Sequence, residues 1–125
     1  MDFKEILGKI DSREFKWKID FYNDQVLRDI LKWPGKMISK FERILDLVEK
    51  HGPQDIGMPH VKSMKDGLFE IRVKAQEGIG RAFFCYVLRN EVVILHGFIK
   101  KTQKTPEKDL NIARKRLKEV KNDIK

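Results

Sequence analysis

The first half of the chain passes from an alternating to a helical pattern of hydrophobic residues. Over residues 15–22 every second side chain is apolar and aromatic or aliphatic, and those between are mostly charged. A period of two predicts a strand with one buried face. Apolar residues then recur at spacings of three and four over residues 24–32 and 36–50. These segments are predicted to form a helical hairpin, whose helices end at a Trp-Pro-Gly triplet and a Gly-Pro pair.

The second half predicts three strands and a final helix. Residues 51–67 hold Gly and Pro at short intervals, so we expect an irregular connection there. Segments 68–75, 81–88 and 91–99 are rich in β-branched and aromatic residues, and short turn sequences between them favour antiparallel hairpins. A helix is predicted after Thr105, which offers an N-cap side chain. Its apolar stripe consists of Leu110, Ala113, Leu117 and Val120.

The predicted elements follow the order β-α-α-β-β-β-α. Strands segregated from helices in this way indicate an α+β fold, in which a small antiparallel or mixed sheet is flanked by an N-terminal helical hairpin and a C-terminal helix. A chain of 125 residues has the size of one ordinary domain. We therefore expect residues 1–125 to form a single domain with one site.

Strand pairing decides which side chains share a face of the sheet. With QEGI as the first loop, Lys74 lies opposite Arg81. Arg72 then faces Phe83, and a two-residue turn before the last strand places His96 opposite Phe83 as well. One face is predicted to carry Arg72, Lys74, Arg81, His96, Phe98 and Lys100. The other face is the predicted core, with Phe69, Ile71, Val73, Ala75, Ala82, Phe84, Tyr86, Leu88, Val93, Leu95 and Ile99.

The net charge of the chain indicates which class of partner it binds. The formal net charge is +8, and residues 100–125 supply +6 of it, from 10 Lys and Arg against 4 Asp and Glu. Such a balance favours a polyanion such as nucleic acid, with anionic lipid as the competing partner. No apolar run is long enough to span a membrane, the start of the chain lacks the apolar core of a signal peptide, and Cys85 is the lone cysteine. We expect a cytoplasmic protein without a membrane partner.

Several chemistries find no signal in the sequence. The three histidines and Cys85 show no metal-ligand spacing, and there is no Gly-rich phosphate loop or dinucleotide fingerprint, so neither a metal nor a cofactor is expected. Cys85 lies within an apolar strand, where an inert thiol is the ordinary case.

The charged face of the sheet offers the best candidates. Arg72 and Arg81 present planar forks that match phosphate oxygens, and from strands they could stabilise a phosphorane-like charge. We expect both to be exposed, with little effect on stability when replaced. His96 is a candidate general acid or base. The alternative is that solvated strands simply carry Lys and Arg, and that a lone histidine is structural.

Residues around this face are candidates for RNA contact. Phe98 could stack on a base, although an aromatic between aliphatic neighbours more often packs in a core. Lys100, Lys101 and Lys104 precede a helix N-terminus, where backbone N–H groups favour anions. A solvated charge run is the alternative interpretation of these lysines.

Four stretches of the sequence carry a family resemblance: Gly57-Met58-Pro59, KDGLFEIRVKA, a Gly followed by Arg81 and an aromatic strand, and LHGFIKKTQKTP with the helix after it. Over roughly residues 15–120 the chain resembles the phage-derived, HigB-like branch of the RelE/ParE toxin superfamily. HGFIKKTQKTP is the most specific part, since no general β-to-α junction requires it.

The resemblance implies a toxin that enters the ribosomal A site and cleaves mRNA, and that a small helix-turn-helix (HigA-like) antitoxin holds inactive. In RelE-like toxins the active residues are basic side chains on the central strands and at the junction into the last helix. The matching positions here are Arg72, Arg81 and Lys100 or Lys101, with Lys74 and Lys104 as neighbours.

This sequence departs from the family pattern at two points. Glu70 stands where RelE itself has a basic strand residue, and the last helix lacks the tyrosine that some relatives use. His96, Glu70 or a lysine must therefore be considered for proton transfer. Because toxins of this fold also include ParE relatives that block gyrase, a non-catalytic gyrase inhibitor or a general RNA-binding module is the alternative function.

Overall fold

The computed structural model describes most of the chain, namely residues 17–52, 60–87, 90–101 and 104–124. The start of the predicted first strand at Phe15, the Gly-Met-Pro motif at 57–59 and Arg89 lie outside the described residues. Within the described ranges, no helix combines the length and the apolar composition that crossing a membrane requires.

The described residues form a five-stranded mixed sheet and three helices. In chain order the elements are β1 (Lys18–Phe21), α2 (Asp24–Leu31), α3 (Gly35–His51), β2 (Val61–Ser63), β3 (Phe69–Ala75), β4 (Gly78–Val87), β5 (Glu91–Lys100) and α4 (Glu107–Ile124). The strand order is β1-β5-β4-β3-β2, with β1 parallel to β5 and the other pairs antiparallel. The α+β class is confirmed, and β2 is an additional strand in the segment that was expected to be irregular.

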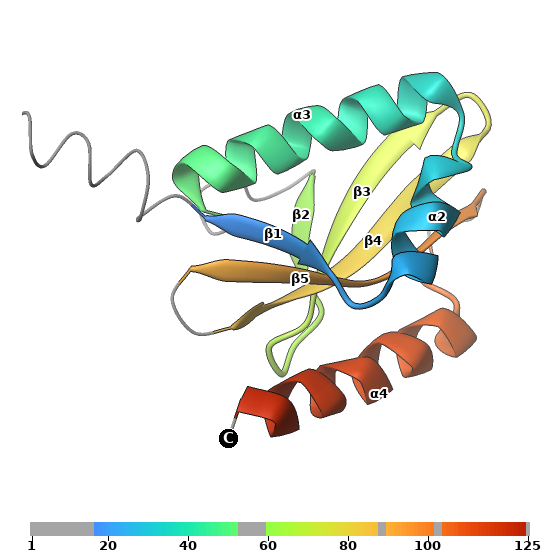
Figure 1. Cartoon of the computed structure of the whole chain (residues 1–125). Coiled ribbons are helices and arrows are strands. Elements are labelled where there is room, and N and C mark those ends of the chain that lie inside the picture. Colours follow the sequence, from blue (N-terminus) through green and yellow to red (C-terminus); the bar gives the residue numbers. More distant parts are fainter. Residues whose placement is uncertain (1–16, 53–59, 88–89, 102–103, 125) are drawn as a thin grey trace, which may run out of the picture.

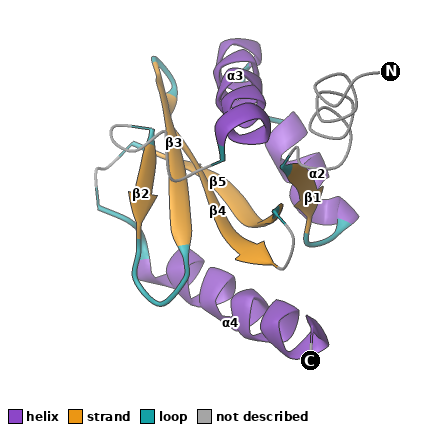
Figure 2. Ribbon diagram, turned by 90° about the vertical axis from the view of Figure 1, so that its left-hand side faces the viewer, coloured by secondary structure: helices purple, strands orange, loops and turns teal. Residues whose placement is uncertain are grey.

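The helices lie on both faces of the sheet. Figure 1 shows α2 and α3 over one face and α4 across the other, and Figure 2 places β2 at the edge farthest from β1. Each face buries its own apolar cluster. The prediction of a single core face was therefore incomplete, because the stripe of α4 also requires an apolar surface to pack against.

Side chains of the α2–α3 region pack very closely against the backbone of the sheet face beneath them. A Cβ atom at Gly97 would lie 2.6 Å from Cγ1 of Ile30, and one at Gly80 would lie 2.6 Å from Sδ of Met37. The side chain of Asn23 caps α2 by accepting from the Val26 amide at 2.9 Å. The two helices therefore rest directly on β4 and β5, at positions where a larger residue would push them away.

The first predicted hairpin has the right partners but a different register. Arg72 lies opposite Arg81, and Lys74 lies opposite Ile79, which shifts the predicted pairing by two residues. The cause is Gly78, whose φ of +144° lets β4 begin immediately after a two-residue turn. A shift of two leaves every side chain of this hairpin on its predicted face, so both arginines remain together on the predicted charged face.

The second hairpin contains a β-bulge. Phe83 pairs with His96 as predicted, but Phe84 pairs with Ile94, which leaves Leu95 as an extra residue in β5. The bulge reverses the alternation of β5. Val92 and Ile94 therefore pack in the cluster under α2 and α3, whereas Val93 and Leu95 pack against α4. The sequence placed Val93 and Leu95 on the core face opposite the charged side chains, and that prediction was wrong.

Candidate functional site

Three of the predicted site residues meet on the face of the sheet that α4 partly covers. Arg72 on β3 and Arg81 on β4 are directly opposite each other. His96 is their neighbour on β5, two residues before the Phe98 that pairs with Arg81. Cross-strand and diagonal neighbours are within reach of long side chains, so the two guanidinium groups and the imidazole lie close together on one face of the sheet.

A buried carboxylate compensates the two arginines. Like charges directly opposite in a sheet repel each other. Glu70 is completely buried, and its Oε1 accepts a hydrogen bond from Nε of Arg72. The Thr105 hydroxyl donates to Oε2 of Glu70 at 3.0 Å and accepts from an Arg81 NH group at 3.3 Å. One anion therefore connects both cations to the junction that leads into α4.

Arg81 differs from expectation in its exposure. We expected a solvated strand residue, but Arg81 is 0% exposed, whereas the Arg72 side chain retains 14% exposure. Its partner Thr105 lies two residues before the start of α4. Burial lowers the pKa of the Arg81 guanidinium, and the charge of Glu70 acts in the opposite direction. Arg81 is thus a fixed cation, while Arg72 reaches solvent.

His96 pairs with a residue that sequence reasoning missed. Its Nε2 lies 2.8 Å from Oδ1 of Asp109, in the first turn of α4, and both side chains are about one seventh exposed, at 15% and 14%. The ring also stacks with Phe98, at 5.5 Å between centroids. A carboxylate on one nitrogen orients the ring and fixes its tautomer. The one available signal was an acidic residue in the first turn of a basic helix.

The predicted lysines are exposed residues at the ends of β3 and β5 and in the segment that precedes α4. Lys100 ends β5, Lys101 and Lys104 follow it, and all three are exposed. Lys74 is also exposed, on β3 at the edge of the sheet. Phe98 is half-buried and packs against the α4 cluster, which agrees with a packing role.

Contacts along α4 hold the helix over the site. An Arg116 NH group donates to the carbonyl of Leu95, the bulge residue, at 2.7 Å. The same guanidinium stacks over the Tyr22 ring at 4.8 Å, and the Tyr22 hydroxyl donates to Glu119. Because these contacts fix the orientation of α4, they also fix where Asp109 meets His96.

The arrangement combines two chemical capacities. Paired guanidinium groups of different exposure suit an anion such as a phosphodiester. An oriented imidazole beside them suits proton transfer. Among the described residues, no group of three His, Cys, Asp or Glu is placed to hold a metal ion.

Comparison with known proteins gives one family and two solved structures of interest. Residues 28–118 match the model of the family described as "Phage derived protein Gp49-like (DUF891)". A mutant of E. coli toxin RelE in the free state is 13% identical, with a TM-score of 0.60, and the match covers 82% of this chain and 98% of that one. A chain of the archaeal RelE–RelB complex from Pyrococcus horikoshii OT3 is 15% identical, with a TM-score of 0.51, and the match covers 71% of this chain and 99% of that one. No curated protein matches the sequence.

Proposed function

This chain belongs to the phage-derived Gp49-like family and has the fold of the RelE-like toxins, and from this premise we propose that it is an mRNA-cleaving toxin. It would act at the ribosome in the cytoplasm, as a HigB-like member of a type II toxin–antitoxin pair. The observation that supports the cleavage step most is the meeting of Arg72, Arg81 and the His96–Asp109 pair on one face.

We infer a metal-independent transesterification. The ribose 2′-oxygen attacks the adjacent phosphorus, its proton passes to a base, and the leaving 5′-oxygen takes up a proton. Arg72 and Arg81 would stabilise the extra negative charge on the phosphorane-like transition state. His96 would perform one of the proton transfers, through Nδ1, because Nε2 is bonded to Asp109.

The exposed lysines have supporting roles in this proposal. Lys100 or Lys101 would supply the second proton transfer or hold the scissile phosphate, since Lys100 ends the strand that carries His96 and Lys101 follows it. Lys74 and Lys104 would contact the flanking RNA backbone. The Phe98 ring would stack on the base next to the cleavage site. Phosphate contacts of this kind position the strand without reading its sequence.

Primer extension on cellular mRNA after induced expression tests the proposal. We expect discrete cuts within translated regions, which disappear when translation initiation is blocked. Intact mRNA together with inhibited gyrase supercoiling would refute it in favour of a ParE-like inhibitor. RNA that is bound but never cut would reduce the protein to a binding module.

We also propose a cognate helix-turn-helix, HigA-like antitoxin. RelE is bound to RelB in the archaeal structure with the same fold, and a nuclease of this kind must be held inactive in the cell that makes it. Co-expression with the product of the neighbouring gene should give a stable complex on size-exclusion chromatography and restore growth. A toxin that remains separate and active beside that product would contradict the proposed partnership.

A further inference from the structure

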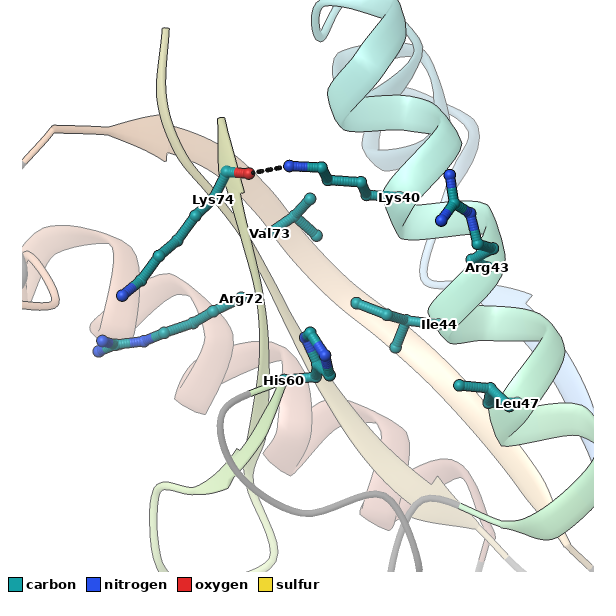
Figure 3. Close-up of a pocket in the computed structure, with 8 residues that line it drawn as sticks. All are labelled: Lys40, Arg43, Ile44, Leu47, His60, Arg72, Val73 and Lys74. Carbon is teal, nitrogen blue, oxygen red and sulfur yellow. Dashed lines mark hydrogen bonds between the residues drawn. The ribbon is translucent and has the colours of Figure 1, made fainter. Parts of the chain in front are cut away.

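A groove opens at the edge of β3, next to the candidate site. Its volume is about 410 Å³, and it lies between α3 and β3 (Figure 3). The lining side chains are Lys40, Arg43, Ile44, Leu47, His60, Arg72, Val73 and Lys74.

The floor of the groove is aliphatic. Ile44 and Leu47 come from neighbouring positions on one face of α3, and Val73 points toward them from β3 (Figure 3). Leu47 is 43% exposed, although most large apolar side chains of α3 are buried. A partly exposed aliphatic floor favours contact with an apolar face of a ligand, such as the flat face of a base.

The walls of the groove are cationic. Lys40, Arg43 and Lys74 are exposed, and none of the eight described residues that line the groove is acidic. The Lys40 ammonium donates to the carbonyl of Lys74 at 2.8 Å, which holds its charge at the edge of the sheet. His60 adds the one ring in the lining set. Cations along a walled groove provide the electrostatics that follow a sugar-phosphate backbone.

The groove is continuous with the site through Arg72. This residue lines the groove and also donates to Glu70 in the buried network. In Figure 3, Arg72 and Lys74 extend to the side of β3 away from α3, while Arg43 and Leu47 approach from α3. A polyanion bound at Arg72 can therefore extend past Lys74 and around the edge of β3 into the groove. Along this path it stays in contact with positively charged side chains.

We propose that this groove holds the single-stranded RNA segment that flanks the scissile phosphate. Lys40, Arg43 and Lys74 bind successive phosphates, and a base lies against the aliphatic floor beside His60. The identity of the ligand as RNA rests on the proposed function. Continuity with the site through Arg72 favours RNA over an acidic peptide, which would use the groove alone.

The test is fluorescence anisotropy with a labelled single strand of 2′-O-methyl RNA, about 12 nucleotides long, which cannot be cleaved. Replacing Lys40 or Arg43 with Ala should weaken binding and reduce the slope of log Kd against log salt by about 0.7 for each variant. Leu47→Ala should weaken binding by about 3- to 10-fold with little change in that slope. The matched controls are Lys50→Ala on the same helix and Arg28→Ala on α2, which should leave both values unchanged.

Two results would overturn the inference. The first is that Lys40→Ala and Arg43→Ala both bind the RNA with the affinity and the salt slope of the parent protein. The other is a peptide of alternating Glu and Leu that binds more tightly than the RNA and displaces it in a Leu47-dependent way. Groove-dependent RNA binding in a protein that makes no cuts in primer extension would support the groove as an RNA-binding site while refuting cleavage, the proposed function.

Discussion

The two faces of the sheet are built on different principles. Toward α2 and α3 the buried side chains are hydrophobic, and the helices touch the backbone at Gly80 and Gly97. Toward α4, an apolar cluster around Phe83 lies beside a buried carboxylate and a buried guanidinium, those of Glu70 and Arg81. One face is organised for packing alone, and the other includes charges that packing does not require.

The face toward α4 should contribute less to stability than the face toward α2 and α3, because it contains buried charges. Taking charges such as Glu70 and Arg81 out of water costs free energy that their mutual attraction only partly offsets. Apolar residues of similar volume would commonly be as stable there. We therefore interpret the ionic network as a functional feature and the opposite face as the main source of stability.

The largest effect on stability should follow truncation of the apolar face. Phe84 is fully buried and stacks on Phe69 at 5.4 Å between centroids. Phe84→Ala should lower the free energy of unfolding by about 3–5 kcal/mol, measured by urea denaturation. The cleavage rate per folded molecule should remain that of the parent. A folded Phe84→Ala protein with a greatly reduced cleavage rate would show that the apolar face also contributes to catalysis, which contradicts the proposed difference between the faces.

The His96–Asp109 pair should show the opposite behaviour. His96→Asn should reduce the single-turnover cleavage rate by about 10²-fold, because a group that transfers a proton is removed. Asp109→Asn should reduce it in the same direction, since the ring loses the carboxylate that orients it. Both proteins should unfold near the parent midpoint. If the His96→Asn variant cleaves at the parent rate, the imidazole has no role in proton transfer.

The two arginines should differ in their effect on folding. Arg81→Ala removes the buried cation beside Glu70 and its hydrogen bond to the Thr105 hydroxyl, so it should cost about 1–3 kcal/mol of stability. Arg72→Ala should cost less, because the Arg72 side chain is partly exposed. Thermal unfolding of both variants measures the difference. Equal costs would mean that burial of Arg81 contributes nothing specific.

The smallest effect concerns Cys85, which packs against α4. Burial raises the pKa of its thiol to about 11, from an ordinary value of 9.0. At about pH 8 the thiol should resist iodoacetamide in the native protein and react in urea, as followed by mass spectrometry. Because the folded state favours the neutral thiol, this contribution to stability is complete below pH 9.0 and disappears as the pH rises to about 11. Rapid native alkylation near neutrality would contradict the burial.

The elements of the fold could be predicted because their patterns are local. Both helices of the hairpin, the three long strands and the stripe of α4 follow from the period of their apolar residues. β2 was missed because it has only three residues within a Gly- and Pro-containing segment. The bulge at Leu95 was missed because a strand with apolar residues on both faces shows no alternation from which to read it.

The site could be predicted only as far as the pairing of three neighbouring strands, β3, β4 and β5. The pattern placed Arg72, Arg81 and His96 on one face, because a register error of two residues preserves the face. It missed Asp109 and the role of Thr105, because their partners are 13 and 35 residues away in sequence. It missed the burial of Arg81 for the same reason, since tertiary packing determines what covers a strand.

The central claim is that Arg72 and Arg81 stabilise the transition state of RNA cleavage. The most direct measurement is the single-turnover cleavage rate of a ribosome-bound mRNA by the parent protein and its variants. Arg72→Ala and Arg81→Ala should each lower the rate by about 10²–10³-fold, which corresponds to about 3–4 kcal/mol. Arg28→Ala, on the exposed side of α2, should cleave at the parent rate. Parent-level rates in both arginine variants, measured on protein shown to be folded, would contradict the account.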